Sequence, residues 1–284
     1  MTLQTLTSAN AEMATYGGTQ ERMGFFTDTT LCIGCKACEV ACKEWNQLPA
    51  DGYNFTGESY DNTGSLSGTT WRHVAFVEQF DHEARDLVAP IAFGDGGRWL
   101  MSSDVCKHCT HAACLDVCPT GALFRTEFGT VVVQDDVCNG CGYCVPACPF
   151  GVIDRRPDTG QAAKCTLCYD RLKDGQKPAC AKACPTESIQ YGSLSELRER
   201  ARGRLDRVAT FNAKAQLYGA ESNDGIGGFG AFFLLTDDPE VYGLPPKPRV
   251  TTQDLPAMWK AAAFAGAALI GAIVIAAVGS RNAG

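Results

Sequence analysis

The sequence of 284 residues predicts an α+β fold in which two cysteine-bearing units are nested, followed by a single C-terminal transmembrane helix. Two observations lead to this fold class. All sixteen cysteines fall into four regularly spaced groups of four, and a nineteen-residue apolar segment lies near the C-terminus. Strand-like segments and one helix-like segment occupy the intervals around the groups, which indicates mixed α+β structure.

The cysteine groups form an internal repeat. The segment "LCIGCKACEVACKEWN" has the spacing C-x2-C-x2-C-x3-C, and the third group repeats it. Proline follows the last cysteine in "CPTGAL", "CPFGVI" and "CPTESI", whereas Lys43 takes that place in the first group. The four groups are Cys32, Cys35, Cys38, Cys42; Cys106, Cys109, Cys114, Cys118; Cys138, Cys141, Cys144, Cys148; and Cys165, Cys168, Cys180, Cys184.

This spacing selects a metal cluster. C-x2-C-x2-C-x3-C is the bacterial ferredoxin pattern, in which three thiolates hold one [4Fe-4S] cluster and the fourth reaches its neighbour. Zinc sites use two CxxC pairs a dozen or more residues apart, a spacing that only the fourth group approaches. Disulfide frameworks belong to small secreted domains, and residues 1–30 contain no apolar run typical of a signal peptide. The sequence therefore predicts four [4Fe-4S] clusters, with a zinc-stabilised interaction scaffold as a distant alternative.

Crossover of each fourth cysteine would arrange the clusters in pairs. Only residues 119–137 separate the middle groups, so we expect these groups to form one ferredoxin-like double-cluster unit from residues 100–155. The first and last groups would form the other unit, from residues 25–45 and 160–192. Spacing alone leaves this nesting open. The predicted boundaries are an N-terminal extension (1–24), a four-cluster ferredoxin-like domain (25–250), a linker (251–256) and an anchor helix (257–279).

Outside the cysteine groups, local patterns predict the remaining elements in order. Residues 49–70 are rich in Gly, Asn, Ser and Thr and indicate a surface loop. Strands are expected at 71–80, 97–103, 129–134 and 230–236. Ser193 and Glu196 have the spacing of a capping box and predict the start of a helix. The Pro-rich segment 243–250 is typical of a linker.

The C-terminal segment 261–279 has neither a charged nor a polar side chain. As a helix it would extend about 28 Å, close to the roughly 30 Å hydrocarbon core of a bilayer. Trp259 and Lys260 before it and Arg281 after it are suited to the two interfaces. These features predict a single-pass anchor in the cell membrane, with a buried soluble helix as the alternative.

The remaining sequence features say less about function. The net charge of -7 argues against nucleic acid as a partner, and no phosphate-binding loop or catalytic triad is present. We therefore expect no enzyme activity from the chain alone. His108 and His111 lie inside the second group, where they could tune a cluster through hydrogen bonds. Lys36, Lys107 and Lys164 adjoin candidate ligands, and each is expected to be a solvated lysine.

The sequence resembles the iron–sulfur (beta) subunits of membrane-bound respiratory formate dehydrogenases, within the molybdopterin oxidoreductase family. The resemblance covers about residues 25–279 and rests on "CIGCKACEVACKEWN", "TTWRHVAFVE", "SSDVCKHCTHAACLDVCPTGAL", "GYCVPACPFGVI", "KCTLCYDRL" and "ACAKACPTESI". It implies an electron-transfer subunit between a formate-oxidising molybdopterin or tungstopterin catalytic (alpha) subunit and a membrane cytochrome b (gamma) subunit and quinone. The alternative is the same role in a hydrogenase, polysulfide reductase or dimethyl sulfoxide reductase complex.

The resemblance also implies a ligand set for each of the four clusters. These sets are set 1 (Cys32, Cys35, Cys38 and Cys184), set 2 (Cys42, Cys165, Cys168 and Cys180), set 3 (Cys106, Cys109, Cys114 and Cys148) and set 4 (Cys118, Cys138, Cys141 and Cys144). Set 1 would lie nearest the catalytic subunit and set 4 towards the membrane. The resemblance favours the outer face of the membrane, whereas the positive charges preceding the anchor favour the cytoplasmic face. The sequence therefore does not decide which side of the membrane the domain faces.

Overall fold

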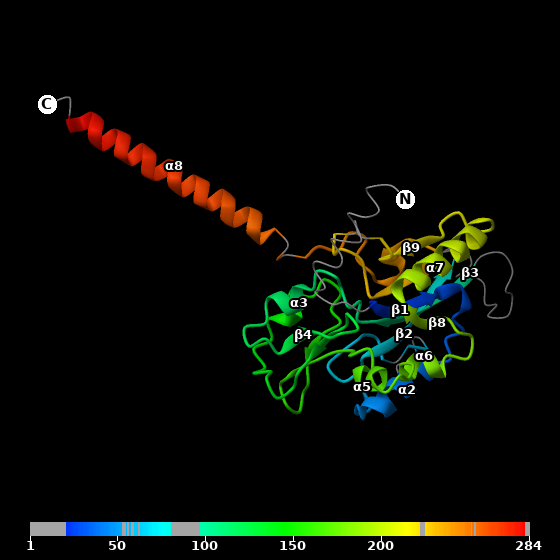
Figure 1. The fold of residues 1–284 in the computed structure, drawn as a ribbon. Coiled ribbons are helices and arrows are strands. Elements are labelled where there is room, and N and C mark those ends of the chain that lie inside the picture. The colour runs from blue at the N-terminus through cyan, green and yellow to red at the C-terminus, as the bar shows by residue number, and fades with distance from the viewer. Residues whose placement is uncertain are drawn as a thin grey trace. The chain divides into compact units, whose positions relative to one another are not determined.

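The computed structural model describes residues 21–52, 55, 57, 60–61, 63–80, 97–221, 225–250, 252 and 254–281. Most of the predicted N-terminal extension and part of the predicted loop at 49–70 lie outside these residues. The chain divides into two units, residues 1–250 and 251–284, which are treated separately below (Figure 1).

A four-stranded mixed sheet with the order β8-β1-β10-β9 organises the first unit. Its strands are β1 (Met23–Asp28), β8 (Ile189–Ser193), β9 (Gln216–Tyr218) and β10 (Ala231–Leu235). β1 runs parallel to β10 and antiparallel to β8, while β9 pairs antiparallel with β10. Every residue of β10 is buried, as in a strand covered on both faces. β10 confirms the strand predicted at 230–236, but the sequence patterns predict none of the other three strands of this sheet.

Helix α7 (Leu194–Ala209) packs against β1 and β8 (Figure 1). Ser193 caps it, because its hydroxyl accepts a hydrogen bond from the backbone N–H of Glu196 at 3.4 Å. The predicted helix start is therefore confirmed. The helix buries one apolar face at helical spacing, formed by Leu194, Leu197, Ala201 and Val208.

The long hairpin of β2 (Arg72–Phe80) and β3 (Gly97–Val105) confirms the two strands predicted there. Arg72 pairs with Val105, the residue directly before Cys106. The hairpin therefore brings the first residue of β2 next to the start of the second cysteine group.

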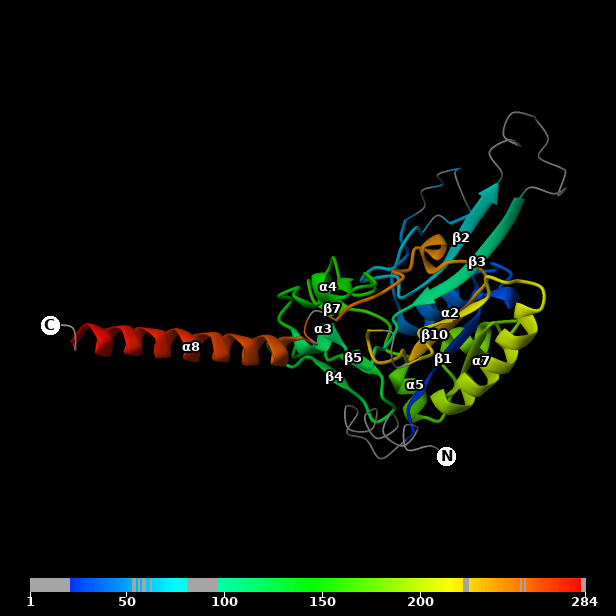
Figure 2. The ribbon, with the colours of Figure 1, turned by 90° about the horizontal axis from the view of Figure 1, so that it is seen from above.

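Short elements carry or flank the cysteine groups. They are η1 (Thr29–Leu31), α2 (Ala37–Asn46), α3 (Ala113–Asp116), β4 (Leu123–Arg125), β5 (Val131–Val133), α4 (Cys144–Ala147), β6 (Asp154–Arg155), β7 (Ala162–Ala163), α5 (Tyr169–Lys173) and α6 (Ala179–Ala183). β5 confirms the strand predicted at 129–134 and pairs with β4. Helices α2 and α6 pack together, and Figure 2 shows α3, α4, β4, β5 and β7 gathered in a separate region of this unit.

The segment 243–250 is not the free linker that its prolines predict. Leu244 and Val250 are buried in the core beside the sheet. The Tyr218 hydroxyl donates a hydrogen bond to the backbone oxygen of Pro245 at 2.6 Å. The turn η3 (Pro239–Tyr242) precedes this segment. Buried apolar side chains thus hold it to the first unit, although its proline content is typical of extended linkers.

The second unit contains helix α8 (Leu255–Arg281). Its residues Ala257–Val278 have a mean hydropathy of 2.4 and are long and apolar enough to cross a membrane. Large apolar side chains such as Phe264, Ile270 and Ile275 are exposed. Length and composition therefore agree with the predicted segment at 257–279, and the helix itself begins at Leu255, before that segment.

Two paired glycines in β1 and β8 provide a test of the sheet. Gly24 pairs with Gly192, but a Cβ at Gly24 would overlap the backbone oxygen of Gly230 and the side chain of Leu194. A Cβ at Gly192 would meet its nearest neighbour, Leu197, at 3.8 Å. We expect Gly24→Ala to lower the free energy of unfolding by about 1–3 kcal/mol, because the strands must move apart.

The matched variant Gly192→Ala should leave stability within about 1 kcal/mol of the natural protein, since the new methyl group fits and the unfolded chain loses freedom. Thermal unfolding followed by circular dichroism measures both variants. Equal unfolding midpoints for the two variants would contradict the close approach of β1 to Gly230.

Candidate metal centres

All sixteen cysteines are free thiols, and each group starts from a similar local turn. The second residue between the first two cysteines of each group has a left-handed backbone. These residues are Gly34 (φ 66°), His108 (φ 43°), Gly140 (φ 72°) and Leu167 (φ 58°). A left-handed residue reverses the chain within one CxxC segment, so its two thiols can face a common centre. Glycine has no penalty for this conformation, whereas His108 and Leu167 are held in it by burial.

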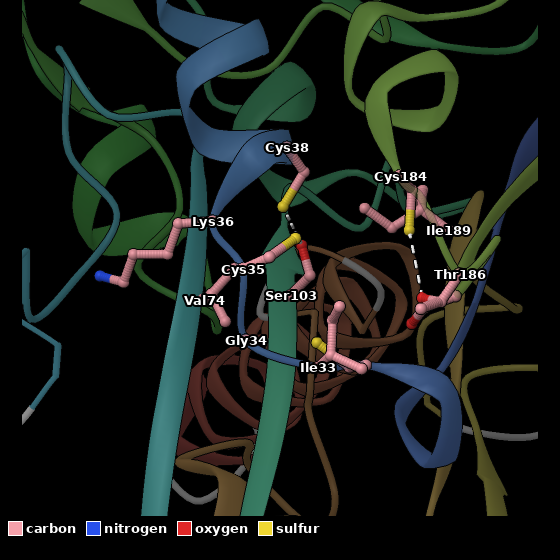
Figure 3. A pocket seen from close by; sticks show the side chains of 12 residues that line it. Ile33, Gly34, Cys35, Lys36, Cys38, Val74, Ser103, Cys184, Thr186 and Ile189 are labelled. Carbon is pink, nitrogen blue, oxygen red and sulfur yellow. Dashed lines mark hydrogen bonds between the residues drawn. The ribbon is translucent and has the colours of Figure 1, made fainter.

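The first and fourth groups exchange members. Cys32 interacts electrostatically with Cys35 and Cys184, and these three thiols line one pocket with Cys38. Figure 3 shows Cys35, Cys38 and Cys184 around this pocket, with Cys184 coming from the turn after α6. In the same way, Cys42 interacts with three thiols of the fourth group, namely Cys165, Cys168 and Cys180.

The two middle groups exchange members in the same way. Cys109 interacts with Cys106 and Cys114 of its own group and with Cys148 of the next one. Cys144 interacts with Cys138 and Cys141 of its own group and with Cys118 of the previous one. Each of these interactions joins thiols that the resemblance assigns to one set. Whether each set shares one cluster stays a prediction.

The sets follow one another in space. Cys38 of set 1 interacts with Cys180 of set 2, and Cys165 of set 2 interacts with Cys106 of set 3. Cys114 of set 3 interacts with Cys144 of set 4. The thiols thus form a continuous series from set 1 to set 4. The two ends of the series each include an exposed cysteine, Cys35 and Cys141.

Burial keeps many of these thiols protonated when no metal is bound. It raises the pKa of Cys114 and Cys165 to about 12 and that of Cys38 to about 11. Neighbouring thiols add to the rise, because two negative charges in a buried site repel each other. Ligation requires thiolates, so a bound cation must replace these protons. The donor set therefore suits a cationic, thiophilic metal group.

A single metal ion and a cluster of several irons require different spacings of four thiols. In a tetrahedral zinc site each sulfur lies about 2.3 Å from the metal. Among the described residues, no three Cys, His, Asp or Glu side chains converge in a way that could hold one metal ion. A cluster of several irons needs ligands farther apart, because its four iron atoms each take one thiolate. The cysteine spacing in the sequence is what favours a cluster over the zinc alternative.

Two of the three lysines beside candidate ligands contradict the expectation of solvated side chains. Lys107 and Lys164 are 0% and 1% exposed. Lys107 Nζ forms an ion pair with Asp104 and donates to the Val105 oxygen at 2.8 Å, while Lys164 Nζ donates to the backbone oxygens of Val131 and Cys165. Local sequence cannot predict the burial of Lys107, because the Phe150 and Phe233 rings beside its ammonium group come from distant parts of the chain. Two lysine ammonium groups therefore lie inside the protein beside candidate ligand cysteines.

Several side chains contact cysteine sulfurs although the sequence analysis did not single them out. Arg72 Nη2 donates to Cys180 Sγ at 3.4 Å, and Ser103 Oγ lies 3.3 Å from Cys38 Sγ. Thr186 Oγ1 lies 3.8 Å from Cys184 Sγ (Figure 3). Only the threonine contact could have been predicted from the sequence, because the motif "CPT" occurs twice. In its other copy, Thr120 Oγ1 lies 3.7 Å from Cys118 Sγ.

Two of the buried donors that have no hydrogen-bond partner among the described residues adjoin the thiol sets. They are Arg72 Nε and His108 Nε2. His108 Nδ1 accepts a hydrogen bond from the backbone N–H of Val131 at 3.1 Å, so the proton of the neutral ring resides on Nε2. Burial lowers the pKa of His108 well below its usual value and keeps the ring neutral. Unpaired buried donors fit a group that carries acceptor atoms such as sulfide.

Comparison with known proteins agrees with this donor chemistry. Residues 31–122 and residues 97–194 each match a family described as a 4Fe-4S dicluster domain. The matches overlap over residues 97–122, and both include the second cysteine group. They therefore cover a continuous region with all four groups rather than two separate domains.

Relatives are similar over most of the chain. The iron-sulfur subunit of the nitrate-inducible formate dehydrogenase of Escherichia coli is 37% identical over 240 residues, 83% of this chain and 76% of that protein. The formate dehydrogenase iron-sulfur subunit of Haemophilus influenzae is 38% identical over 228 residues, 78% of this chain and 68% of that protein. The B subunit of the anaerobic dimethyl sulfoxide reductase of E. coli is 35% identical over 192 residues, 66% of this chain and 80% of that protein.

Proposed function

The chain belongs to the family of iron–sulfur subunits of formate dehydrogenases, and from this premise we propose that it relays electrons along four [4Fe-4S] clusters. It is an electron-transfer subunit and not a catalytic subunit on its own. The number of clusters and their ligands, the sources and acceptors of electrons, and the membrane anchoring belong to the proposal.

The observation that carries the proposal is the continuous series of thiol sets. Each set contains four cysteines, and an electrostatic interaction between thiols links each set to the next. In the proposal, sets 1 to 4 each hold one cluster, in the nested arrangement of two ferredoxin-like units. Such clusters supply one-electron transfer when bound.

The protein contributes positions, charge and exclusion of water. Thiolates of the four sets would fix each cluster, and burial around Cys109, Cys114 and Cys165 removes water from the middle of the series. Lys107 and Lys164 supply fixed positive charge there. Hydrogen bonds, net charge and solvent exposure are the properties through which a protein adjusts cluster potentials.

The partners follow from the relatives. Formate dehydrogenase iron-sulfur subunits cover most of this chain, so we propose a formate-oxidising molybdopterin or tungstopterin subunit as the electron source. A membrane cytochrome b and quinone would receive the electrons. A dimethyl sulfoxide reductase complex is the second candidate, supported by a relative that matches a smaller share of the chain.

The membrane contact would be helix α8. Its span Ala257–Val278 has the length and composition of a membrane-crossing helix, and its large apolar side chains are exposed. Burial in lipid would remove that apolar surface from water. We therefore propose a single-pass anchor, with the side of the membrane undetermined.

Formate should reduce the protein only within its complex. Adding formate to the anaerobically purified complex should bleach the broad visible absorption of the clusters, and a quinone analogue should restore it. The isolated chain should not respond, because it has no substrate site of its own. Bleaching by hydrogen, or reoxidation of reduced clusters by dimethyl sulfoxide, with no response to formate, would replace the formate assignment and leave the relay in place.

The crossover of ligands can be tested by paired substitutions. Cys35→Ala and Cys184→Ala should perturb the same paramagnetic signal, because both thiols belong to the proposed set 1. Cys118→Ala, in set 4, should disturb a different signal. Electron paramagnetic resonance of reduced samples measures this. If the Cys35 and Cys184 variants lose different signals, the proposed pairing is wrong.

Removal of the anchor helix should change location without changing cofactor content. A protein ending at residue 254 should move to the soluble fraction with its iron content unchanged, because all sixteen cysteines lie within residues 1–250. Membrane flotation in the absence of other membrane subunits gives the readout. A truncated protein that still floats with membranes would contradict the anchor.

A further inference from the structure

Arg72 is an arginine buried in an unusual place. Its side chain is 1% exposed and is among the largest fully buried side chains of the described residues. It enters the core from the first position of β2, opposite Val105 of β3. Its guanidinium carbon lies 4.9 Å from the centre of the Phe25 ring. An arginine stays charged in proteins, so the fold contains a full positive charge at this position.

The guanidinium contacts one thiol set directly and is linked to a second set through Ser103. Nη2 donates to Cys180 Sγ of set 2 at 3.4 Å. Nη1 donates to the backbone oxygen and the Oγ of Ser103, both at 3.2 Å. Ser103 Oγ in turn lies 3.3 Å from Cys38 Sγ of set 1 (Figure 3). Arg72 therefore connects Cys180 directly and Cys38 through Ser103.

The counter-charge of Arg72 comes from sulfur. Burial lowers the pKa of Arg72, and the nearby sulfurs of Cys180, Cys38, Cys165 and Cys42 raise it. Its Nε is buried with no hydrogen-bond partner in the part of the protein that the structure describes. A buried charge without an opposite charge is strongly unfavourable, so this site is balanced only when the surrounding sulfurs are anionic. Four thiolates around an iron–sulfur cluster provide that anionic charge.

We propose that Arg72 is the shared positive charge of sets 1 and 2 and raises the midpoint potentials of both clusters. This inference rests on the proposed function, because it requires a cluster in each set. Reduction adds one negative charge beside the guanidinium, which favours the reduced form. Hydrogen bonds to ligand sulfurs act in the same direction, because they stabilise the more negative state. The direct contact to Cys180 makes the effect larger at set 2 than at set 1.

The first test removes the positive charge of Arg72. The holoprotein carrying Arg72→Gln, with any subunits that accompany it, is purified anaerobically, and each paramagnetic signal is titrated against applied potential. Signals are assigned with cysteine-to-alanine variants of each set. At the potential where the natural set 2 cluster is half reduced, the ratio of reduced to oxidised cluster should fall at least tenfold, which is about 59 mV for a one-electron couple. The set 1 signal should shift in the same direction by less.

The matched control is Arg171→Gln. Arg171 is 5% exposed and lies in α5, close to set 2 in sequence. Its Nε donates to the backbone oxygen of Lys177 at 2.7 Å, and its guanidinium carbon lies 4.2 Å from the centre of the Trp45 ring. Loss of this charge should change the same ratio less than about threefold, since charges that do not touch a ligand sulfur act more weakly. Equal shifts in the two variants would mean that any nearby positive charge has this effect, and would overturn the proposal.

Two milder variants keep the test decisive if Arg72→Gln loses clusters. Arg72→Lys keeps the charge but not the planar donor pair, and Ser103→Ala removes only the hydroxyl between Arg72 and Cys38. Ser103→Ala should lower the midpoint potential of set 1 more than that of set 2. Arg72→Lys should shift the midpoint potential of the set 2 cluster less than Arg72→Gln does. Unchanged potentials in these variants, with full iron and sulfide, would overturn the inference.

Iron and acid-labile sulfide content separate this inference from the proposed function. A natural protein without sulfide would refute the cluster relay itself. A natural protein with clusters whose potentials do not respond to changes at Arg72 and Ser103 would refute only the role of Arg72.

Discussion

The pairing of β1 with β8 is the constraint on which the rest of the structure depends. Cys32 follows β1 by four residues, and Cys184 precedes β8 by five. The two strands are antiparallel, with Thr27 opposite Ile189, so these two cysteines emerge at the same end of the sheet. Asp28 and Ser188 lock this end, because Asp28 N donates to the Ser188 oxygen at 2.8 Å and the Ser188 hydroxyl donates to the Asp28 oxygen at 2.7 Å. Without this pairing, no local sequence holds the first and last cysteine groups together.

Buried charge is the second feature that links fold and site. Arg72, Lys107 and Lys164 are almost completely inaccessible to solvent, and all three lie next to cysteines. The raised pKa values of the surrounding thiols mean that these cysteines would be neutral in the absence of metal. Lys107 is then still paired with Asp104, whereas Arg72 lacks the anionic sulfurs that would balance its charge. Binding of a thiolate-ligated group would supply that charge, so folding and cofactor binding would stabilise each other.

The series of thiol sets explains why the cysteines are shared between segments. Each set takes three thiols from one group and one from another, and the exchanged cysteine also ties its own group to the neighbouring set. This arrangement shortens the separation between consecutive sets, because a single helix such as α2 carries Cys38 of one set and Cys42 of the next. A relay needs consecutive centres close together in space, and the shared segments provide this closeness.

Local sequence determined the features whose interactions span only a few residues. The cysteine spacing indicates the cofactor, Ser193 and Glu196 mark the start of α7, and the apolar run at 261–279 marks the membrane-competent part of α8. Only the tertiary structure decided which cysteines lie together, where β1, β8 and β9 pair, and that Lys107 and Lys164 are buried. β1 is buried along nearly its whole length, and β8 and β9 are short, so none of them shows the alternation that reveals a half-buried strand. Contacts between residues more than a hundred positions apart depend on the packing of the whole protein, which no local pattern encodes.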